Sequence, residues 1–218
     1  MKAIHLFMFF LILLPLELIS CESAVNNPEE YSAGYVESET PAQIAAVNSA
    51  VSTPDLTPAE IAGLMLMREE EKMAKDVYTY FYSQFKYLIF NNISKSETVH
   101  AEAVLRVINY YKLTDPATKV TGTFTDAHLQ ELYTKFTTEA KTVEDALKTG
   151  AFIEEYDITD LKKLIDETDN TYIKRVYTNL KGGSENHLRA FTRTLKLRGI
   201  VYVPVILTED EYLAIINK

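Results

Sequence analysis

Four long stretches of this chain repeat apolar residues at alternating intervals of three and four, the spacing that places side chains on one face of an α-helix. Each stretch interrupts its apolar face near the middle with a polar residue. These residues are Glu71, Glu97 with His100, Glu154, and His187. Four amphipathic helices must bury their apolar faces against one another, which directs all the interruptions into one interior.

Local signals mark where the four helices begin and end. A capping residue followed by proline and glutamate satisfies the free backbone N–H groups of a new helix. Proline disfavours the helical conformation in the residue before it, and glycine often follows a helix. The signals are Thr57-Pro58-Ala59-Glu60 at the first start, Asp115-Pro116 after the second helix, Thr142 with Asp145 at the third start, and Asp169-Asn170 and Gly199 around the fourth helix.

The composition agrees with a helical fold. Only seven glycines and seven prolines occur in 218 residues, which argues against a β-sandwich with many tight turns. Short additional helices are expected at about 126–137 and in the tail, where Thr208-Glu209-Asp210-Glu211 is a capping box. We therefore predict an all-α protein with a four-helix bundle at residues 56–200 and a C-terminal extension with a short helix at 201–218.

Residues 1–21 have the pattern of a secretory signal peptide. Lys2 precedes an apolar run, residues 3–16, that is short for a membrane span. The run ends in Leu18-Ile19-Ser20-Cys21, which resembles the lipobox of bacterial lipoproteins, whose cysteine is lipidated and becomes the first mature residue. The alternatives are an ordinary signal peptide or an anchor helix with an incidental cysteine. Because the chain has one cysteine, a lipidated form has no free thiol for catalysis or disulfides.

Residues 22–55 are rich in Ser, Glu, Asn, Ala, Pro and Thr and show no sustained helical period, which predicts a flexible linker. Together with the lipobox, this predicts an extracytoplasmic protein that is anchored to the membrane by acyl chains, or secreted. The net charge of −9 leaves no excess of Lys and Arg for a phosphate backbone, so we expect no nucleic-acid partner.

The polar interruptions have the chemistry of metal ligands. A lone carboxylate inside a bundle loses its hydration, which disfavours its charged form, and a shared cation removes that cost. Glu97 and His100 are three residues apart and project from the same helix face. Ferritin-like di-iron and di-manganese proteins place one Glu on each of two helices and Glu-x-x-His on each of the other two.

Residues 56–198 resemble the ferritin-like superfamily, in which the rubrerythrins are well-known relatives, and more closely an uncharacterised ferritin-like family, DUF2202. The resemblance rests on four segments in the same order, Met67–Tyr78, Ser96–His100, Gly150–Ile158 and Ser184–Phe191. It implies a bundle with a centre of iron or manganese ions, generally two. In the better-known relatives such centres react with dioxygen or peroxide, or oxidise and store iron.

The resemblance assigns the metal ligands position by position. They are Glu71 on the first helix, Glu97 and His100 on the second, Glu154 on the third, and His187 on the fourth. The fourth helix departs from the pattern, because Ser184 stands three residues before His187, where the relatives have a ligating Glu. A mononuclear centre therefore stays open.

Four further residues are secondary candidates: Glu70, Glu155, Asp157 and Glu185. Glu70 is the alternative to Glu71 in an acidic run, and Glu155 and Asp157 lie close to Glu154. Glu185 is about 100° around the helix from the ligand position and could reach the site only if Gly182-Gly183 loosens that turn.

Some of these residues also have structural interpretations. Glu97 could pair with Ser94 in a capping box if the second helix begins there. His100 and His187 could be core histidines that are bonded to backbone carbonyls. Tyr78 is expected in the core, with a hydrogen bond to a ligand as the alternative, and His128 is expected at the surface.

The resulting prediction is a metal-binding protein of the bundle interior, with an oxidoreductase acting on peroxide or dioxygen as the enzymatic interpretation. Such an enzyme needs an external electron donor, since the chain lacks a cysteine-based electron-transfer module. The alternatives are a non-catalytic metal scavenger and a bundle with a purely structural polar cluster. Association into a homo-oligomer stays open.

Overall fold

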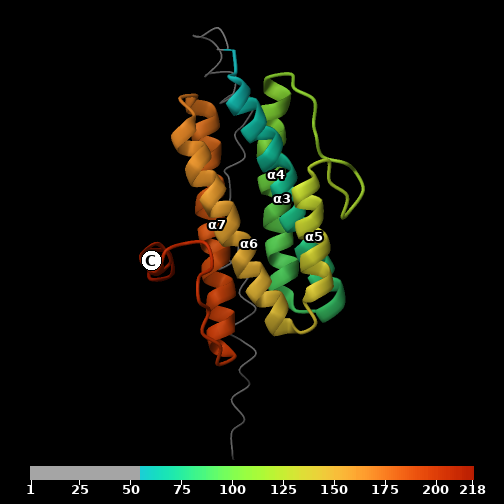
Figure 1. Cartoon of the computed structure of the whole chain (residues 1–218), viewed down its shortest axis with the longest axis vertical. Helices are drawn as coiled ribbons and strands as arrows, with labels where there is room; N and C mark the ends of the chain where they lie inside the picture. Colours follow the sequence, from blue (N-terminus) through green and yellow to red (C-terminus); the bar gives the residue numbers. More distant parts are fainter. Residues whose placement is uncertain (1–54) are drawn as a thin grey trace, which may run out of the picture.

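The structure is a computed structural model that describes residues 55–218. The predicted signal peptide with its lipobox-like end, and the linker except its last residue, lie outside the described residues. Within them the chain forms six α-helices and no strand (Figure 1). The helices are α3 (Pro58–Phe85), α4 (Leu88–Tyr110), α5 (Ala127–Glu139), α6 (Val143–Glu167), α7 (Thr171–Leu197) and α8 (Glu209–Ile216).

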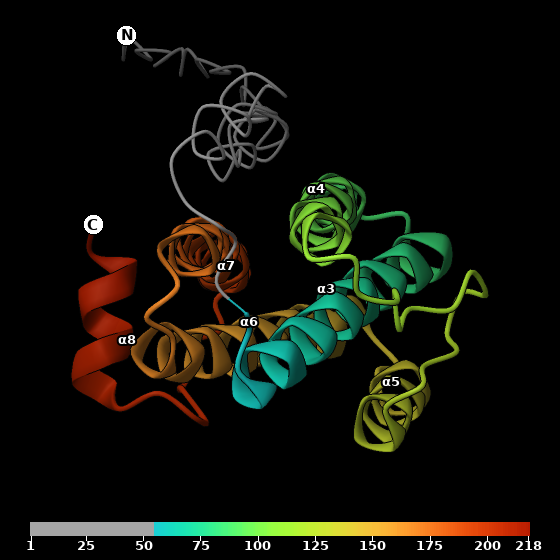
Figure 2. The same ribbon diagram turned by 90° about the horizontal axis from the view of Figure 1, so that it is seen from above.

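The four long helices form a bundle of two hairpins. Helix α3 packs along α4, and α6 packs along α7; contacts of α3 with α6 and of α4 with α7 join the two pairs. Seen along the bundle, α5 covers the outer side of α3, and α8 packs outside α7 (Figure 2). The predicted all-α bundle with short additional helices is confirmed.

The helix boundaries follow the local signals closely. Thr57, Thr142 and Thr208 each cap a helix through a complete capping box, and Asp126 and Asn170 cap the starts of α5 and α7. Helix α3 ends at Lys86, whose left-handed backbone (φ 54°) turns the chain directly into α4. Because α4 begins at Leu88, Glu97 lies well inside that helix and the capping role with Ser94 is wrong.

Two apolar clusters fill the bundle, one above and one below a polar layer. One cluster combines the first part of α3 with the last part of α4, and includes Leu64, Met67 and Val107. The other combines the last part of α3 with the start of α4 and includes Phe81, Phe90 and Phe191. Between them the long helices contribute buried polar residues, which are Glu71, Glu97, His100, Glu154, Asp157, Ser184 and His187.

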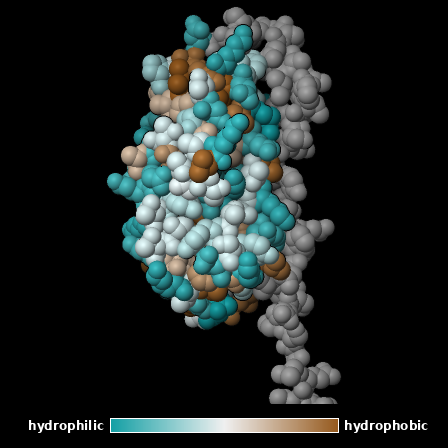
Figure 3. Space-filling view, turned by 90° about the vertical axis from the view of Figure 1, so that its right-hand side faces the viewer, coloured by the Kyte–Doolittle hydropathy of each residue, from teal (hydrophilic) through white to brown (hydrophobic). Residues whose placement is uncertain are grey.

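One face of the bundle is mostly polar. On the side that α5 covers, hydrophilic and intermediate residues form most of the surface, and apolar residues are scattered or gathered near one end (Figure 3). None of the helices at residues 55–218 is long and apolar enough to cross a membrane.

Candidate metal centre

The five predicted ligands converge in the polar layer. Helix α3 contributes Glu71, α4 contributes Glu97 and His100, α6 contributes Glu154, and α7 contributes His187. None is more than 2% exposed, so the cluster is shielded from bulk water. The spacing of three and four residues places these side chains on the inner faces of their helices. The packing of the two hairpins then brings them to the same level along the bundle axis.

Glu97 lies between the two histidines. Its Oε2 atom is 2.8 Å from Nδ1 of His100, and its Oε1 atom is 2.8 Å from Nδ1 of His187. Each histidine also approaches a second carboxylate: Nδ1 of His100 is 3.4 Å from Oε2 of Glu71, and Nδ1 of His187 is 3.4 Å from Oε2 of Glu154. The cluster thus has two similar halves that share one carboxylate.

These short contacts are not hydrogen bonds. Nδ1 of both histidines and Oε1 of Glu97 are buried and make no hydrogen bond. Oε1 of Glu71 is buried and unpartnered as well. Ligand atoms of Glu97, His100 and His187 all lie within 4.8 Å of one another. Donor atoms that crowd together without bonding to one another have the geometry expected of ligands around a cation.

The two imidazole rings stack across the cluster. Their centroids are 5.3 Å apart and the planes differ by 26°. Nε2 of His187 lies 3.0 Å from Oγ of Ser96 on α4. When Nε2 carries the proton and donates it to Ser96, Nδ1 keeps the lone pair that a metal ion requires. Sequence reasoning missed Ser96 as the partner of His187, because the contact joins two different helices.

Tyr78 holds the carboxylate of Glu154 in place. Its hydroxyl donates to Oε1 of Glu154 at 2.6 Å and lies 3.3 Å from the carbonyl oxygen of Gly150. The ring of Phe191 packs directly on Gly150, where an added Cβ would come within 2.6 Å of the ring. A side chain at position 150 would push Phe191 against Tyr78, whose ring centroid is 5.3 Å away. Because Gly150 has no side chain, Phe191 and Tyr78 can pack together beside α6, where the hydroxyl of Tyr78 bonds to Glu154.

The electrostatics favour positive charge between the two rings. Burial raises the pKa of Glu97, but His187 and His100 outweigh burial and hold that pKa well below its ordinary value. Burial lowers the pKa of His187, yet the nearby Glu97 and Glu154 raise it to about 9. Glu97 and Glu71 likewise raise the pKa of His100 well above its ordinary value, against the effect of burial. Protons thus occupy the region that a metal cation would take.

The pKa values of the two outer carboxylates, Glu71 and Glu154, lie above their ordinary value, unlike that of Glu97. Burial raises the pKa of Glu71 to about 7, with His100 lowering it and Glu97 adding repulsion. Burial and the charge of Glu97 raise the pKa of Glu154, and His187 lowers it. Without a cation, the outer carboxylates therefore tend to hold protons, which a bound metal ion would displace.

Asp157 and Ser184 occupy the side of the cluster where the resemblance places a fourth-helix Glu. Oγ of Ser184 donates to Oδ2 of Asp157 and contacts the carbonyl oxygen of Leu180 at 3.1 Å. Oδ1 of Asp157 is buried without a partner, and burial together with the charges of Glu71 and Glu70 raises the pKa of Asp157 well above its ordinary value. A carboxylate is thus present here, contributed by α6 instead of α7.

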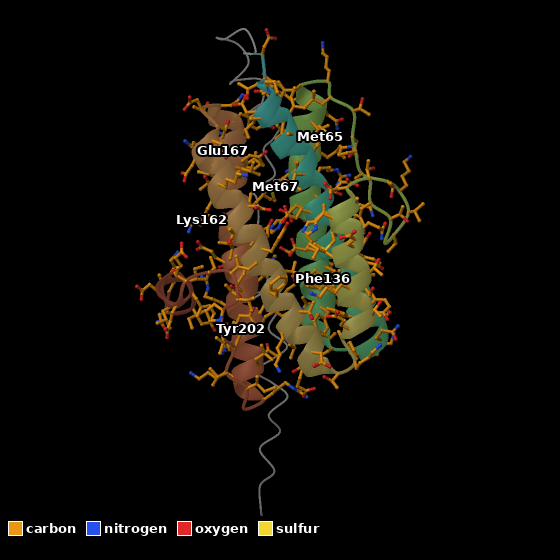
Figure 4. The ribbon with its side chains drawn as sticks, viewed as in Figure 1. Met65, Met67, Phe136, Lys162, Glu167 and Tyr202 are labelled. Atoms are coloured by element: carbon orange, nitrogen blue, oxygen red, sulfur yellow. The ribbon has the colours of Figure 1, made fainter. Side chains whose placement is uncertain are left out.

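The structure does not bring Glu155 to the cluster. Its carboxylate binds the C-terminal extension and accepts hydrogen bonds from Tyr202 Oη and from the backbone N–H groups of Val205, Ile206 and Leu207, at 2.5–3.1 Å. Figure 4 shows Tyr202 beside the bundle, at the junction with this extension. The four donors compensate this buried carboxylate for the loss of its hydration.

Glu185 also lies away from the cluster. It pairs with Lys181 at 2.6 Å and with Lys218 at 2.9 Å, and these lysines lower its pKa against the effect of burial. Helix α7 is continuous through Gly182 and Gly183, so no loosened turn redirects Glu185. His128 is exposed on α5, as predicted. Glu70 is buried beside Glu71 but faces a different set of groups.

Comparison with known proteins identifies the family. The model of the "Uncharacterized protein domain (DUF2202)" matches residues 60–218. An uncharacterized protein of Methanocaldococcus jannaschii, MJ0754, is 43% identical over 172 residues, which cover 78% of this chain and 93% of the relative. The crystal structure of hypothetical protein MJ0754 from Methanococcus jannaschii matches with a TM-score of 0.75 at 43% identity, over 78% of this chain and 98% of that chain. On the family match and this identity, the chain belongs to the DUF2202 family.

Proposed function

We propose that this protein binds two iron or manganese ions in the polar layer of its bundle, one in each half of the cluster. Glu71 and His100 form the first half, and Glu154 and His187 form the second, with Glu97 shared between them. The observation that carries this proposal is the pair of 2.8 Å contacts between Glu97 and the two Nδ1 atoms, which lack hydrogen-bond geometry.

The donor set supports this choice of metal. Imidazole nitrogens and carboxylate oxygens together suit divalent iron and manganese, whereas structural zinc sites favour thiolates. Asp157 also supports two ions over one. With Glu71, Glu97 and Glu154 it supplies four negative charges, which balance two divalent cations when both histidines are neutral.

A purely structural cluster explains the geometry less well. Buried polar groups that serve stability pair with one another, whereas here Glu71, Glu97, both histidines and Asp157 all retain buried atoms without hydrogen-bond partners. Such atoms are costly in the absence of a ligand.

The protein side chains would prepare the site and restrict access. Bound iron or manganese would supply oxidation–reduction chemistry toward dioxygen or peroxide. Tyr78 orients Glu154, Ser96 selects the tautomer of His187, and the apolar clusters above and below exclude water. With no cysteine at residues 55–218, electrons for repeated turnover would come from an external donor.

Metal analysis tests the proposal. Protein purified without chelators and loaded anaerobically with Fe(II) or Mn(II) should retain about two ions per chain after desalting, as a preformed buried site does. Glu97→Gln keeps the shape but removes the shared charge, and should weaken binding at least about tenfold. Glu102→Gln, exposed on the same helix, is the matched control and should bind normally. Retention of less than about 0.2 ion per chain by the wild-type protein contradicts the proposal.

A second measurement separates an enzyme from a metal scavenger. Stopped-flow mixing of the loaded protein with peroxide should change the metal absorption and consume peroxide. A loaded protein whose spectrum and peroxide concentration stay constant binds metal without this redox activity, which restricts the proposal to storage or scavenging.

A further inference from the structure

A groove of about 960 Å³ opens between α7 and the C-terminal part of the chain. One wall is α7, and the other is formed by the C-terminal extension together with α8. Figure 2 shows that α8 lies on the side of the bundle opposite α5. None of the residues of the metal centre lines the groove. It is therefore a separate feature, with a volume in the range of ligand-binding sites.

The wall that α7 contributes is basic. Arg189, Arg193 and Lys196 line the groove and are spaced by four and three residues, so they follow one face of the helix. Lys218 adds a positive side chain, and Glu209 is the one acidic side chain among the lining residues. A groove with this balance of charge attracts an acidic partner.

Some of these charges are already engaged and others are open to a partner. Arg189 donates to the carbonyl oxygen of Ile215 at 3.1 Å, and Lys218 pairs with Glu185 at 2.9 Å. Lys196 is exposed and forms no ion pair within residues 55–218. It is therefore a cation that a ligand in the groove can use.

The opposite wall is apolar and partly uncovered. Val201 is 84% exposed, Val203 72% and Leu213 40%, and all three line the groove. Tyr202 and Tyr212 are buried in the same wall, with ring centroids 6.0 Å apart. Apolar side chains that gather at a surface beside polar ones mark interaction sites. The groove therefore fits a partner that carries both acidic and apolar side chains.

The chain itself contains a segment of this chemistry, outside the described residues. Residues 22–54 include five glutamates and no lysine, arginine or histidine. Four of these glutamates, and both aromatic residues of the stretch, fall within residues 29–39. The segment reads Glu29-Glu30-Tyr31-Ser32-Ala33-Gly34-Tyr35-Val36-Glu37-Ser38-Glu39. Acidic side chains flank a largely apolar centre, which complements both walls of the groove.

The segment is long enough to reach the groove. The hydroxyl of Thr168 donates to Glu60 at 2.6 Å, so the start of α7 lies beside the start of α3, where residue 55 enters the bundle. From there to Lys196 the helix rises about 38 Å. The connection from Glu39 to Asp55 spans up to about 55 Å when extended. Since this tether gives an effective concentration on the order of 1 mM, a weak contact is sufficient, which favours this segment over a separate acidic protein.

We propose that residues 29–39 bind in the groove between α7 and α8 of the same chain. The glutamates face the basic wall at Lys196, and the two tyrosines cover the apolar wall at Leu213. Bound there, the segment shields the exposed apolar side chains and closes the groove to other acidic peptides. The contact does not depend on metal in the centre.

Carbodiimide cross-linking of the full chain, read by peptide mass spectrometry, tests the contact. The reagent forms an amide between a lysine and a carboxylate that touches it, without a spacer. Lys174 is the matched control, because it is exposed on the same helix and lies closer to the point where the segment joins α3. Residues 29–39 should link to Lys196 about tenfold more often than to Lys174. A segment that moves freely links to Lys174 at least as often, and that result overturns the proposal.

Variants on both sides of the contact locate it in the groove. Leu213→Ser, and Tyr31→Ser combined with Tyr35→Ser, should each reduce the links to Lys196 about tenfold, because they remove apolar side chains from the contact. Neither change touches the buried core, since Leu213 is partly exposed and the tyrosines precede the bundle. Val120→Ser, 62% exposed between α4 and α5, should leave the links unchanged. Links that persist in both groove and segment variants overturn the groove as the site.

Isotope mixing shows whose segment is bound. When ¹⁴N and ¹⁵N protein are mixed before cross-linking, the links should join peptides of the same isotope. Links that join different isotopes as often as the same one show that a second copy supplies the segment, which overturns binding within one chain. High salt should reduce the links to Lys196, since it screens the charges of the basic wall.

Discussion

Oε1 of Glu97 lies 2.8 Å from Nδ1 of His187, and neither atom makes a hydrogen bond. A carboxylate and an imidazole this close normally share a proton along the line between them. Here they lie close together without a hydrogen bond, and Nδ1 of His100 is likewise 2.8 Å from Oε2 of Glu97 without one.

Removing either histidine should empty one half of the centre. His100→Leu and His187→Leu should each retain about one Mn²⁺ per chain after desalting in place of about two, because each imidazole serves one ion. Elemental analysis gives the count. Thr194→Val, which removes a buried polar group from α7 outside the cluster, should retain both ions. A wild-type count in both histidine variants would show that the two halves are not separate ion sites.

Metal affinity should rise with pH toward about 9. In the metal-free protein the pKa of His187 is about 9, above its ordinary value, so below that pH a metal ion must displace a proton. The stabilisation from this protonated ring is complete below about pH 6.5 and is lost as the pH rises through about 9. Glu71, with a pKa of about 7, adds a second proton at lower pH.

The apparent affinity for Mn²⁺ should therefore increase by up to about tenfold per pH unit for each displaced proton between pH 6.5 and 8.5. Titration in a weak buffer should show proton release on binding. An affinity that is independent of pH over this range is incompatible with protonated ligands in the metal-free state.

Ser96→Ala should weaken metal binding without unfolding the protein. The serine hydroxyl is the partner of Nε2 of His187, and its loss leaves the tautomer and orientation of the ring unfixed. We expect an affinity lower by about tenfold, measured by competition with a chelator. Thr98→Ala, on the same helix and bonded only to a backbone carbonyl in its own turn, serves as the control. Equal affinities in the two variants would remove Ser96 from the site.

Gly150→Ala should destabilise the bundle, whereas Gly182→Ala should not. An alanine Cβ at position 150 would meet the ring of Phe191 at 2.6 Å, and overpacking of this kind costs about 1–3 kcal/mol. Nothing lies within 4 Å of a Cβ at position 182, so that variant should gain up to about 1 kcal/mol from helix propensity. Urea unfolding of both variants gives the comparison. A Gly150→Ala protein as stable as Gly182→Ala would show that Phe191 can move aside freely.

Glu155→Gln should release the C-terminal extension and leave the metal centre intact. The amide group of glutamine would face backbone N–H donors of Val205–Leu207, so at least one buried donor loses its acceptor at a cost of about 1–3 kcal/mol. Hydrogen exchange should become faster in residues 202–216 and remain slow in α4. Glu167→Gln, exposed at the end of α6, should change neither quantity. Unchanged exchange in Glu155→Gln would mean that other contacts hold the extension.

Helical periodicity predicted the bundle and the convergence of its polar residues, because a spacing of three and four fixes which side of a helix is buried. The same periodicity placed Glu154 on the inner face of its helix in preference to its neighbour Glu155, which binds the C-terminal extension. The capping signals at Thr57, Thr142 and Thr208 located helix starts because they depend on contacts within a single turn.

Contacts between distant segments could not be predicted in this way. The partnership of Ser96 with His187 depends on how α4 and α7 are rotated against each other, and Ser96 lies beside the apolar stripe. The replacement of a fourth-helix Glu by Asp157 of α6 depends on the height at which two helices meet. The place of Glu70 depends on where α5 rests against α3, which the hydrogen bonds of Glu69 determine.

The polar layer between two apolar clusters also fixes the register of the bundle. If α7 slid by one turn, about 5.4 Å, Phe191 or Gly183 would stand opposite Glu97, and His187 would enter an apolar cluster. Either displacement buries a charge without a counterpart, which is far more costly than a mismatch between apolar side chains. A chain whose core was apolar throughout could slip between neighbouring alignments, whereas the polar layer of this bundle favours the alignment that keeps Glu97 between the two histidines.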